Sequence, residues 1–78
     1  MAYTYLDLAS QVLTENGQPM TIRQIWDYAI AKGYQGKLES IGKTPEKTMN
    51  ASLHKDIARK EAARFKQVNK KPALFDLK

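Results

Sequence analysis

Three successive segments of this 78-residue chain carry apolar residues at the three- and four-residue spacing of an α-helix. The first segment follows Thr4, a typical N-cap residue, and ends at Asn16-Gly17. The second begins at Thr21, with Gln24 completing a capping box, and ends at Gly33. The apolar positions of the three segments are Leu6, Ala9, Val12 and Leu13, then Ile22, Ile25, Trp26, Ala29 and Ile30, then Met49, Leu53 and Ile57. A chain of this length buries only about 60% of the surface that its unfolded state exposes, so we expect one small domain, residues 1–78, with a thin core.

The third helix has the strongest start signal in the chain. Thr44 is a favourable N-cap residue, Pro45 suits the first helical position, and Glu46 places an acid at the positive end of the helix dipole. The sequence therefore predicts a helix from Pro45 to Arg59. The segment before it, Tyr34–Lys43, has two glycines and no clear period, which predicts a loop.

Two short apolar segments, Phe65–Val68 and Ala73–Leu77, flank the polar turn Asn69–Pro72 and predict a β-hairpin. Met20 lies after Pro19, where a short strand or bridge is expected. Three helices followed by a hairpin predict a mainly α fold with a small β wing, the winged helix-turn-helix. In that fold the second and third helices form the helix-turn-helix, although the loop between them is longer than the usual turn.

Composition excludes several kinds of chemistry. There is no cysteine and only one histidine, so disulfides, thiol catalysis and a zinc site built from cysteine and histidine are excluded, and we expect no cofactor. No apolar run approaches the roughly 20 residues of a membrane span, and no signal peptide is apparent, which predicts a cytoplasmic protein, nucleoid-associated if bacterial. The carboxylates are scattered, and Ser52, His54 and Asp56 cannot form a triad because residues two apart on a helix do not face each other. We therefore expect neither an enzyme nor a small-molecule substrate.

The positive charge is concentrated in the second half of the chain. The formal net charge is +5; residues 1–42 hold three Lys or Arg and four Asp or Glu, while residues 43–71 hold nine Lys or Arg and three Asp or Glu. Such an asymmetry favours a polyanionic partner, and double-stranded DNA fits it. A solvated helix face explains the same lysines about equally well, so the charge pattern alone leaves both interpretations open.

A helical wheel places small and basic residues opposite the apolar face of the third helix. Small side chains let a helix backbone approach base edges, while long cations contact phosphates. The residues expected nearest the bases are Lys47, Thr48, Ala51 and His54. The residues expected at phosphates are Lys43, Thr44 and Lys55, together with Lys70 and Lys71 in the wing.

The run from Lys43 to Leu53, followed by Asp56-Ile57, resembles the HARE-HTH family, as do Thr21–Trp26 and Arg64-Phe65. The resemblance covers about Tyr3 to Leu77. Residue by residue, Thr44 and Pro45 match the start of the family's third helix, Asn50 and Ser52 match polar positions beside the core face, and Phe65 matches the wing-strand aromatic. The turn Asn69–Pro72 departs from the glycine-rich turn that is common in relatives.

This resemblance implies a winged helix that binds DNA, with a preference for modified or distorted DNA. Members occur as N-terminal modules of restriction endonucleases, in chromatin regulators, and in the delta subunit of RNA polymerase. The first hypothesis is therefore a DNA-targeting module of a larger protein, such as one with a nuclease domain in the same chain. The alternative is a protein-interaction module of the RNA polymerase delta-subunit type, with Tyr34–Ile41 as the contact. A purely structural cap on a larger enzyme is the third hypothesis.

Overall fold

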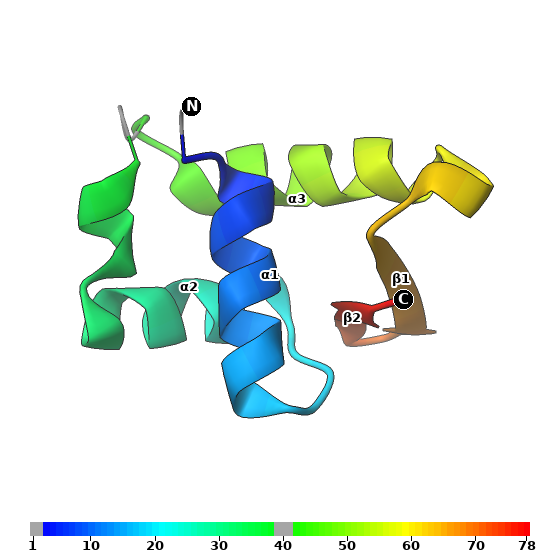
Figure 1. The fold of residues 1–78 in the computed structure, drawn as a ribbon, viewed down its shortest axis with the longest axis horizontal. Coiled ribbons are helices and arrows are strands. Elements are labelled where there is room, and N and C mark those ends of the chain that lie inside the picture. The colour runs from blue at the N-terminus through cyan, green and yellow to red at the C-terminus, as the bar shows by residue number, and fades with distance from the viewer. Residues whose placement is uncertain (1–2, 39–41) are drawn as a thin grey trace.

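The computed structural model describes residues 3–38 and 42–78. Three α-helices, α1 (Tyr5–Asn16), α2 (Ile22–Lys32) and α3 (Pro45–Ile57), are followed by the strands β1 (Phe65–Lys70) and β2 (Ala73–Leu77). Two short 3₁₀ helices, η1 (Tyr34–Lys37) and η2 (Lys60–Ala62), lie before and after α3. Helix α1 stands across α2 and α3, and the hairpin lies beside the carboxyl end of α3 (Figure 1). This arrangement is the winged helix that the sequence predicts.

The first two helices begin and end at the predicted residues. Thr4 and Thr21 both accept a hydrogen bond from the backbone three residues on, and Asp7 and Gln24 complete the two capping boxes. Gly17 and Gly33 follow the helices at φ angles of 75° and 78°, where a residue with a Cβ is strained. Local sequence chemistry therefore sets the lengths of α1 and α2.

The surroundings of α3 differ from the prediction in three ways. Tyr34–Lys37, predicted as loop, forms η1, because the chain leaving Gly33 closes further 3₁₀ turns, with Gly36 and Leu38 donating to Gly33 and Gln35. The helix ends at Ile57 instead of Arg59, because the Arg59 N–H bonds to the Asp56 carbonyl in a tighter turn. Thr44 is the N-cap residue, but its side chain caps nothing; its carbonyl instead accepts the Thr48 hydroxyl at 3.3 Å.

The hairpin is longer than predicted, and its turn is shorter. β1 and β2 are antiparallel, with Phe65 opposite Leu77 and Lys70 opposite Ala73, so Asn69 and Lys70 belong to β1 and the turn is Lys71-Pro72. The bond between Lys71 and Pro72 is cis. A bulge between Gln67 and Asn69 shifts the register along the strand. Met20 adds the predicted bridge by exchanging two backbone hydrogen bonds with Phe75, at 3.0 and 2.8 Å.

The core lies between the three helices and the inner face of the hairpin. Fully buried side chains come from every main element and include Leu8, Val12, Ile25, Met49, Leu53, Phe65 and Phe75. Because Phe65 and Phe75 contribute to this core, the wing is packed onto the helices and holds a defined position beside α3. No helix in the described part of the chain is long and apolar enough to cross a membrane.

Candidate nucleic-acid interface

The outer face of α3 is the surface that the helical wheel predicts. Met49 and Leu53 are fully buried on the inner side, and the predicted base-contacting residues, Lys47, Thr48, Ala51 and His54, are all exposed. The predicted phosphate-contacting residues are exposed too: Lys43, Thr44, Lys55, Lys70 and Lys71. Every predicted site residue is therefore available to a ligand.

The acidic residues of α3 are kept off this face. Asp56 is 2% exposed and lies on the inner side of the helix. The Glu46 carboxylate lies 3.5 Å from the Arg23 guanidinium of α2, and Arg23 also pairs with Asp27 at 3.3 Å. These pairs are exposed, so they contribute little to stability. Together with the burial of Asp56, the pairing of Glu46 affects the charge of the outer face of α3: the positive side chains there have no acidic side chain among them.

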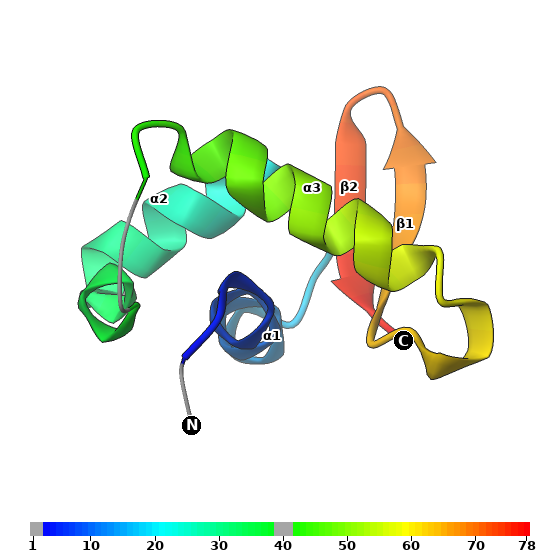
Figure 2. The same cartoon turned by 90° about the horizontal axis from the view of Figure 1, so that it is seen from above.

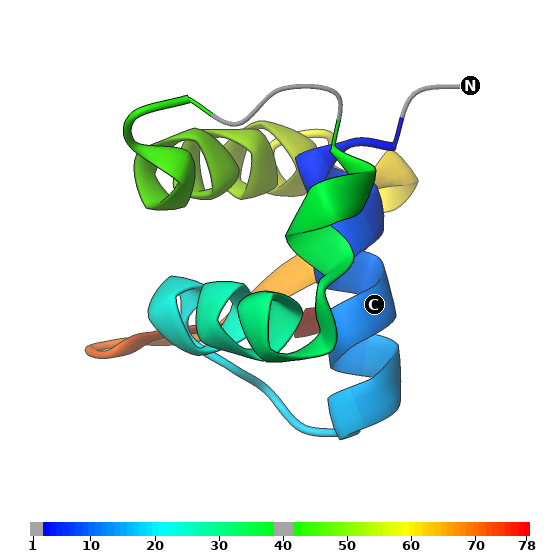
Figure 3. The ribbon, with the colours of Figure 1, turned by 90° about the vertical axis from the view of Figure 1, so that its left-hand side faces the viewer.

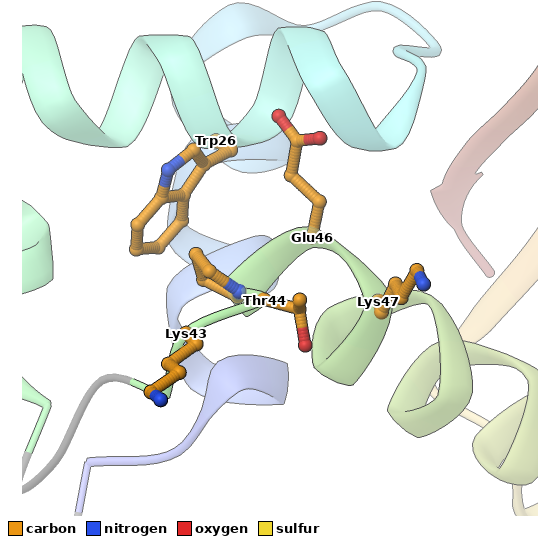
Figure 4. A pocket seen from close by; sticks show the side chains of 6 residues that line it. Trp26, Lys43, Thr44, Glu46 and Lys47 are labelled. Carbon is orange, nitrogen blue, oxygen red and sulfur yellow. The ribbon is translucent and has the colours of Figure 1, made fainter.

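An open depression of about 360 Å³ lies at the amino end of α3. Its wall is formed by Trp26, Lys43, Thr44, Pro45, Glu46 and Lys47. Glu46 points toward α2 beside Trp26, and Lys43 and Lys47 lie on either side of Thr44 (Figure 4). Since no side chain caps this helix end, the backbone N–H groups after Pro45 have no side-chain acceptor. The depression thus combines two ammonium groups and a helix amino terminus, which favour an anion, with the Glu46 carboxylate, which opposes one and is paired with Arg23.

The base of the wing packs beside the carboxyl end of α3, but its turn projects to the same side of the molecule as the amino end of α3. The turn of the hairpin and the amino-terminal half of α3 both project away from α1, as two perpendicular views show (Figures 2 and 3). Lys70 and Lys71, at this turn, are therefore separate from the group of Lys43, Thr44 and Lys47 but accessible from the same side. The structure thus places predicted residues in two groups, one at the amino end of α3 (Lys43, Thr44 and Lys47) and one at the turn of the wing (Lys70 and Lys71). The outer face of α3 joins the two groups.

His54 connects the two groups. Its ring lies edge-on to the buried Phe75 ring of β2, with centroids 5.6 Å apart and planes at 82°. An aromatic pair of this geometry restricts the orientation of the exposed imidazole. His54 therefore lies at the junction of α3 and the wing, where a ligand that touches both would meet it.

Sequence reasoning missed two residues beside the site. Arg23, one of the three basic residues among residues 1–42, has no predicted site role, although its (i, i+4) spacing to Asp27 indicates that its side chain is held in place. Trp26 is 8% exposed and belongs to the core, as predicted, but it also lines the depression. Its second role depends on the position of α3 and left no signal in the sequence.

The segment proposed for a protein contact, Tyr34–Ile41, is described only as far as Leu38; Ile41 lies outside the described residues. The Tyr34 hydroxyl donates to Glu15 of α1 at 2.5 Å, and the same carboxylate accepts the Tyr28 hydroxyl at 3.2 Å. Lys37 lies over the Tyr34 ring, 5.0 Å from its centroid. The Tyr34 bond holds η1 against α1, and the same Glu15 carboxylate ties α2 to α1 through Tyr28. Within the described residues, no group of three or more His, Asp or Glu is placed to hold a metal ion.

Three helices, a bridge at Met20 and a two-stranded wing define a winged helix-turn-helix domain. A family model for the HARE-HTH domain, whose description includes the words "restriction endonuclease HTH domain", matches residues 3–77. The chain belongs to the HARE-HTH family, a family of helix-turn-helix domains associated with DNA binding. No curated protein and no solved structure matches the chain significantly.

Proposed function

We propose that this domain binds double-stranded DNA, with α3 in the major groove and the wing on the phosphate backbone. The observation that carries the proposal is the outer face of α3, where basic and small side chains are exposed while Asp56 is buried and Glu46 is paired with Arg23. A face without acids suits a polyanion, and alanine lets the backbone approach base edges.

Each predicted residue then has a role. Lys47, Thr48, Ala51 and His54 would lie nearest the bases, while Lys43, Thr44, Lys55, Lys70 and Lys71 would contact phosphates. The depression at the amino end of α3 would hold one phosphate between Lys43 and Lys47. If about five phosphates are neutralised, the logarithm of affinity falls with the logarithm of salt concentration with a slope of about −4.5.

We further propose that the domain directs an effector to DNA, such as a restriction-type nuclease, and that it distinguishes modified from unmodified duplexes. The support for the effector is the family description, which names a restriction endonuclease. The support for a sensor of modification is the family resemblance alone. A domain of this size contacts few base pairs, so strong sequence specificity would need a second module or a dimer.

An NMR titration of the isolated domain with short unmodified and cytosine-methylated duplexes tests the proposal. We expect amide shifts on residues 43–55 and 70–71 that weaken as salt is raised, and a difference between the two duplexes if modification is recognised. The double variant Lys32→Ala/Lys37→Ala is the control for net charge, because it removes two cations that lie outside the proposed DNA interface, in α2 and η1. Absence of shifts at low salt would refute DNA binding and would favour the protein-interaction alternative on the surface around Tyr34.

A further inference from the structure

We infer that Asp56 is a positioning residue that sets the direction of the wing relative to α3, and so determines whether Lys70 and Lys71 reach the same DNA as α3. The part of this inference that concerns DNA rests on the proposed function.

Asp56 holds together the end of α3 and the start of the wing. Its Oδ2 accepts the backbone N–H of Arg64 at 2.8 Å and that of Phe65, the first residue of β1, at 3.0 Å. Its Oδ1 lies 3.5 Å from the Arg59 guanidinium. Asp56 is the one buried charged residue within residues 3–38 and 42–78. One carboxylate therefore closes the segment between α3 and β1 at the base of the wing.

A buried carboxylate is poor evidence for added stability, because the cost of removing it from water often exceeds what its bonds return. Two charge-assisted bonds to adjacent N–H groups are, however, strongly directional. The chain reverses sharply between α3 and these two N–H groups, with Lys60 at a φ of 57°. The two bonds to Asp56 nevertheless fix where β1 begins. The clearest contribution of the Asp56 carboxylate is therefore to the position of β1 relative to α3.

The base of the wing has two further ties. The Arg64 guanidinium lies 3.4 Å from Asp7 of α1, and the Arg64 carbonyl accepts the Lys78 N–H at 3.0 Å. These contacts anchor the same end of the hairpin, and the lysines lie at the other end. β1 is six residues long, so Phe65 and Lys70, at its two ends, lie about 17 Å apart, and a rotation of about 10° at the base moves the turn by about 3 Å. Such a movement is enough to break a contact between an ammonium group and a phosphate.

The test is Asp56→Asn, which keeps the side-chain size but removes the negative charge. Its one carbonyl oxygen cannot both accept the two N–H groups, as Oδ2 does, and face the Arg59 guanidinium, as Oδ1 does. Residual dipolar couplings of the DNA-free domain would report the direction of β1 and β2 relative to α3. We expect a changed direction in this variant and no change in Val12→Ala, a control that lowers stability from within α1. Unchanged couplings in Asp56→Asn would overturn the inference whether or not the domain binds DNA.

The second measurement is a double-mutant cycle with a short duplex, at a temperature where circular dichroism shows every variant folded. In the wild-type background, Lys70→Ala/Lys71→Ala should make the salt slope shallower by about 1.8. In the Asp56→Asn background we expect Lys70→Ala/Lys71→Ala to make less than half of that change. Lys47→Ala should change the salt slope equally in both backgrounds. Equal effects of Lys70→Ala/Lys71→Ala in both backgrounds would overturn the role of Asp56 in DNA binding. Failure of the wild-type domain to bind any duplex would instead refute the proposed function and, with it, the DNA part of this inference.

Discussion

The Tyr34 hydroxyl donates a hydrogen bond of 2.5 Å to the Glu15 carboxylate, across a gap of nineteen residues in the sequence. This bond ties η1, which leads toward α3, to the carboxyl end of α1. It also has a measurable electrostatic consequence. The hydrogen bond to Glu15, followed by desolvation and the negative charge of Glu15, raises the pKa of Tyr34 to about 12.

We expect Tyr34 to keep its proton well above pH 10, where a tyrosine in the unfolded chain ionises. Between about pH 10 and 12 the folded state then binds more protons at this site than the unfolded state, so this contribution to stability falls as pH rises. NMR titration of the Tyr34 ring carbons measures the midpoint. The Glu15→Gln variant should move the midpoint down toward 10. A wild-type midpoint near 10 would contradict the bond.

The two threonines that precede α2 and α3 should respond differently to truncation. Thr21 accepts a backbone hydrogen bond within a full capping box, whereas the Thr44 side chain caps nothing. We expect Thr21→Ala to lower the free energy of unfolding by about 1 kcal/mol and Thr44→Ala by less than half of that. Urea denaturation followed by Trp26 fluorescence compares the two. Equal losses would mean that Thr44 caps α3 in solution.

Thr44 shows where prediction from the sequence ends. The periods and caps of α1 and α2 are local, so Thr4, Thr21, Gly17 and Gly33 could be placed from sequence alone. Thr44 is the N-cap residue that the sequence predicts, but its own backbone, at φ −129° and ψ 69°, lies outside the extended conformation of Thr4 and Thr21, and its hydroxyl does not cap the helix. The exposed face of α3 was predictable for the same reason as the first helices, because a helical wheel needs only the period.

The wing and its anchor were less predictable, because distant contacts decide them. Asn69 and Lys70 are polar and resemble turn residues, yet they pair with β2 because the buried rings of Phe65 and Phe75 fix the register. The bonds from Asp56 to Arg64 and Phe65 depend on how the chain reverses after α3. Neither feature leaves a periodic signal in the sequence.

Glu46 should weaken DNA binding in the wild-type domain. Its carboxylate lines the depression at the amino end of α3 and occupies the Arg23 guanidinium. We expect Glu46→Gln to raise affinity for duplex DNA several-fold, and to steepen the salt slope by up to about 0.9 if the released Arg23 takes a phosphate. Fluorescence anisotropy at several salt concentrations measures both quantities.

The control for Glu46→Gln is Glu61→Gln, which makes the same change of charge beyond the other end of α3, in η2. A rise confined to Glu46→Gln would support a phosphate at the depression, while an equal rise in both variants would reveal only a change in net charge. Because the Arg23–Glu46 pair is exposed, we expect its loss to change the free energy of unfolding by less than about 1 kcal/mol.

His54 and the wing lysines should have different effects on sequence preference. Lys70 and Lys71 lie at the turn of the hairpin, and phosphate contacts from there would be independent of sequence. The double variant Lys70→Ala/Lys71→Ala should therefore weaken binding to all duplexes by a similar factor. His54→Ala or Thr48→Ala should instead change the ranking of duplexes, by about 1–3 kcal/mol at a contacted base pair.

A panel of duplexes that differ at single base pairs, measured by competition at one salt concentration, separates these outcomes. His54→Ala also removes the edge-on contact to Phe75, so His54→Gln, which keeps a hydrogen-bonding side chain, is measured beside it. Uniform losses from His54→Ala, His54→Gln and Thr48→Ala across the whole panel would show that α3 recognises no base. The domain would then bind DNA through contacts to the DNA phosphates alone, and any sequence specificity would need a second module or a dimer.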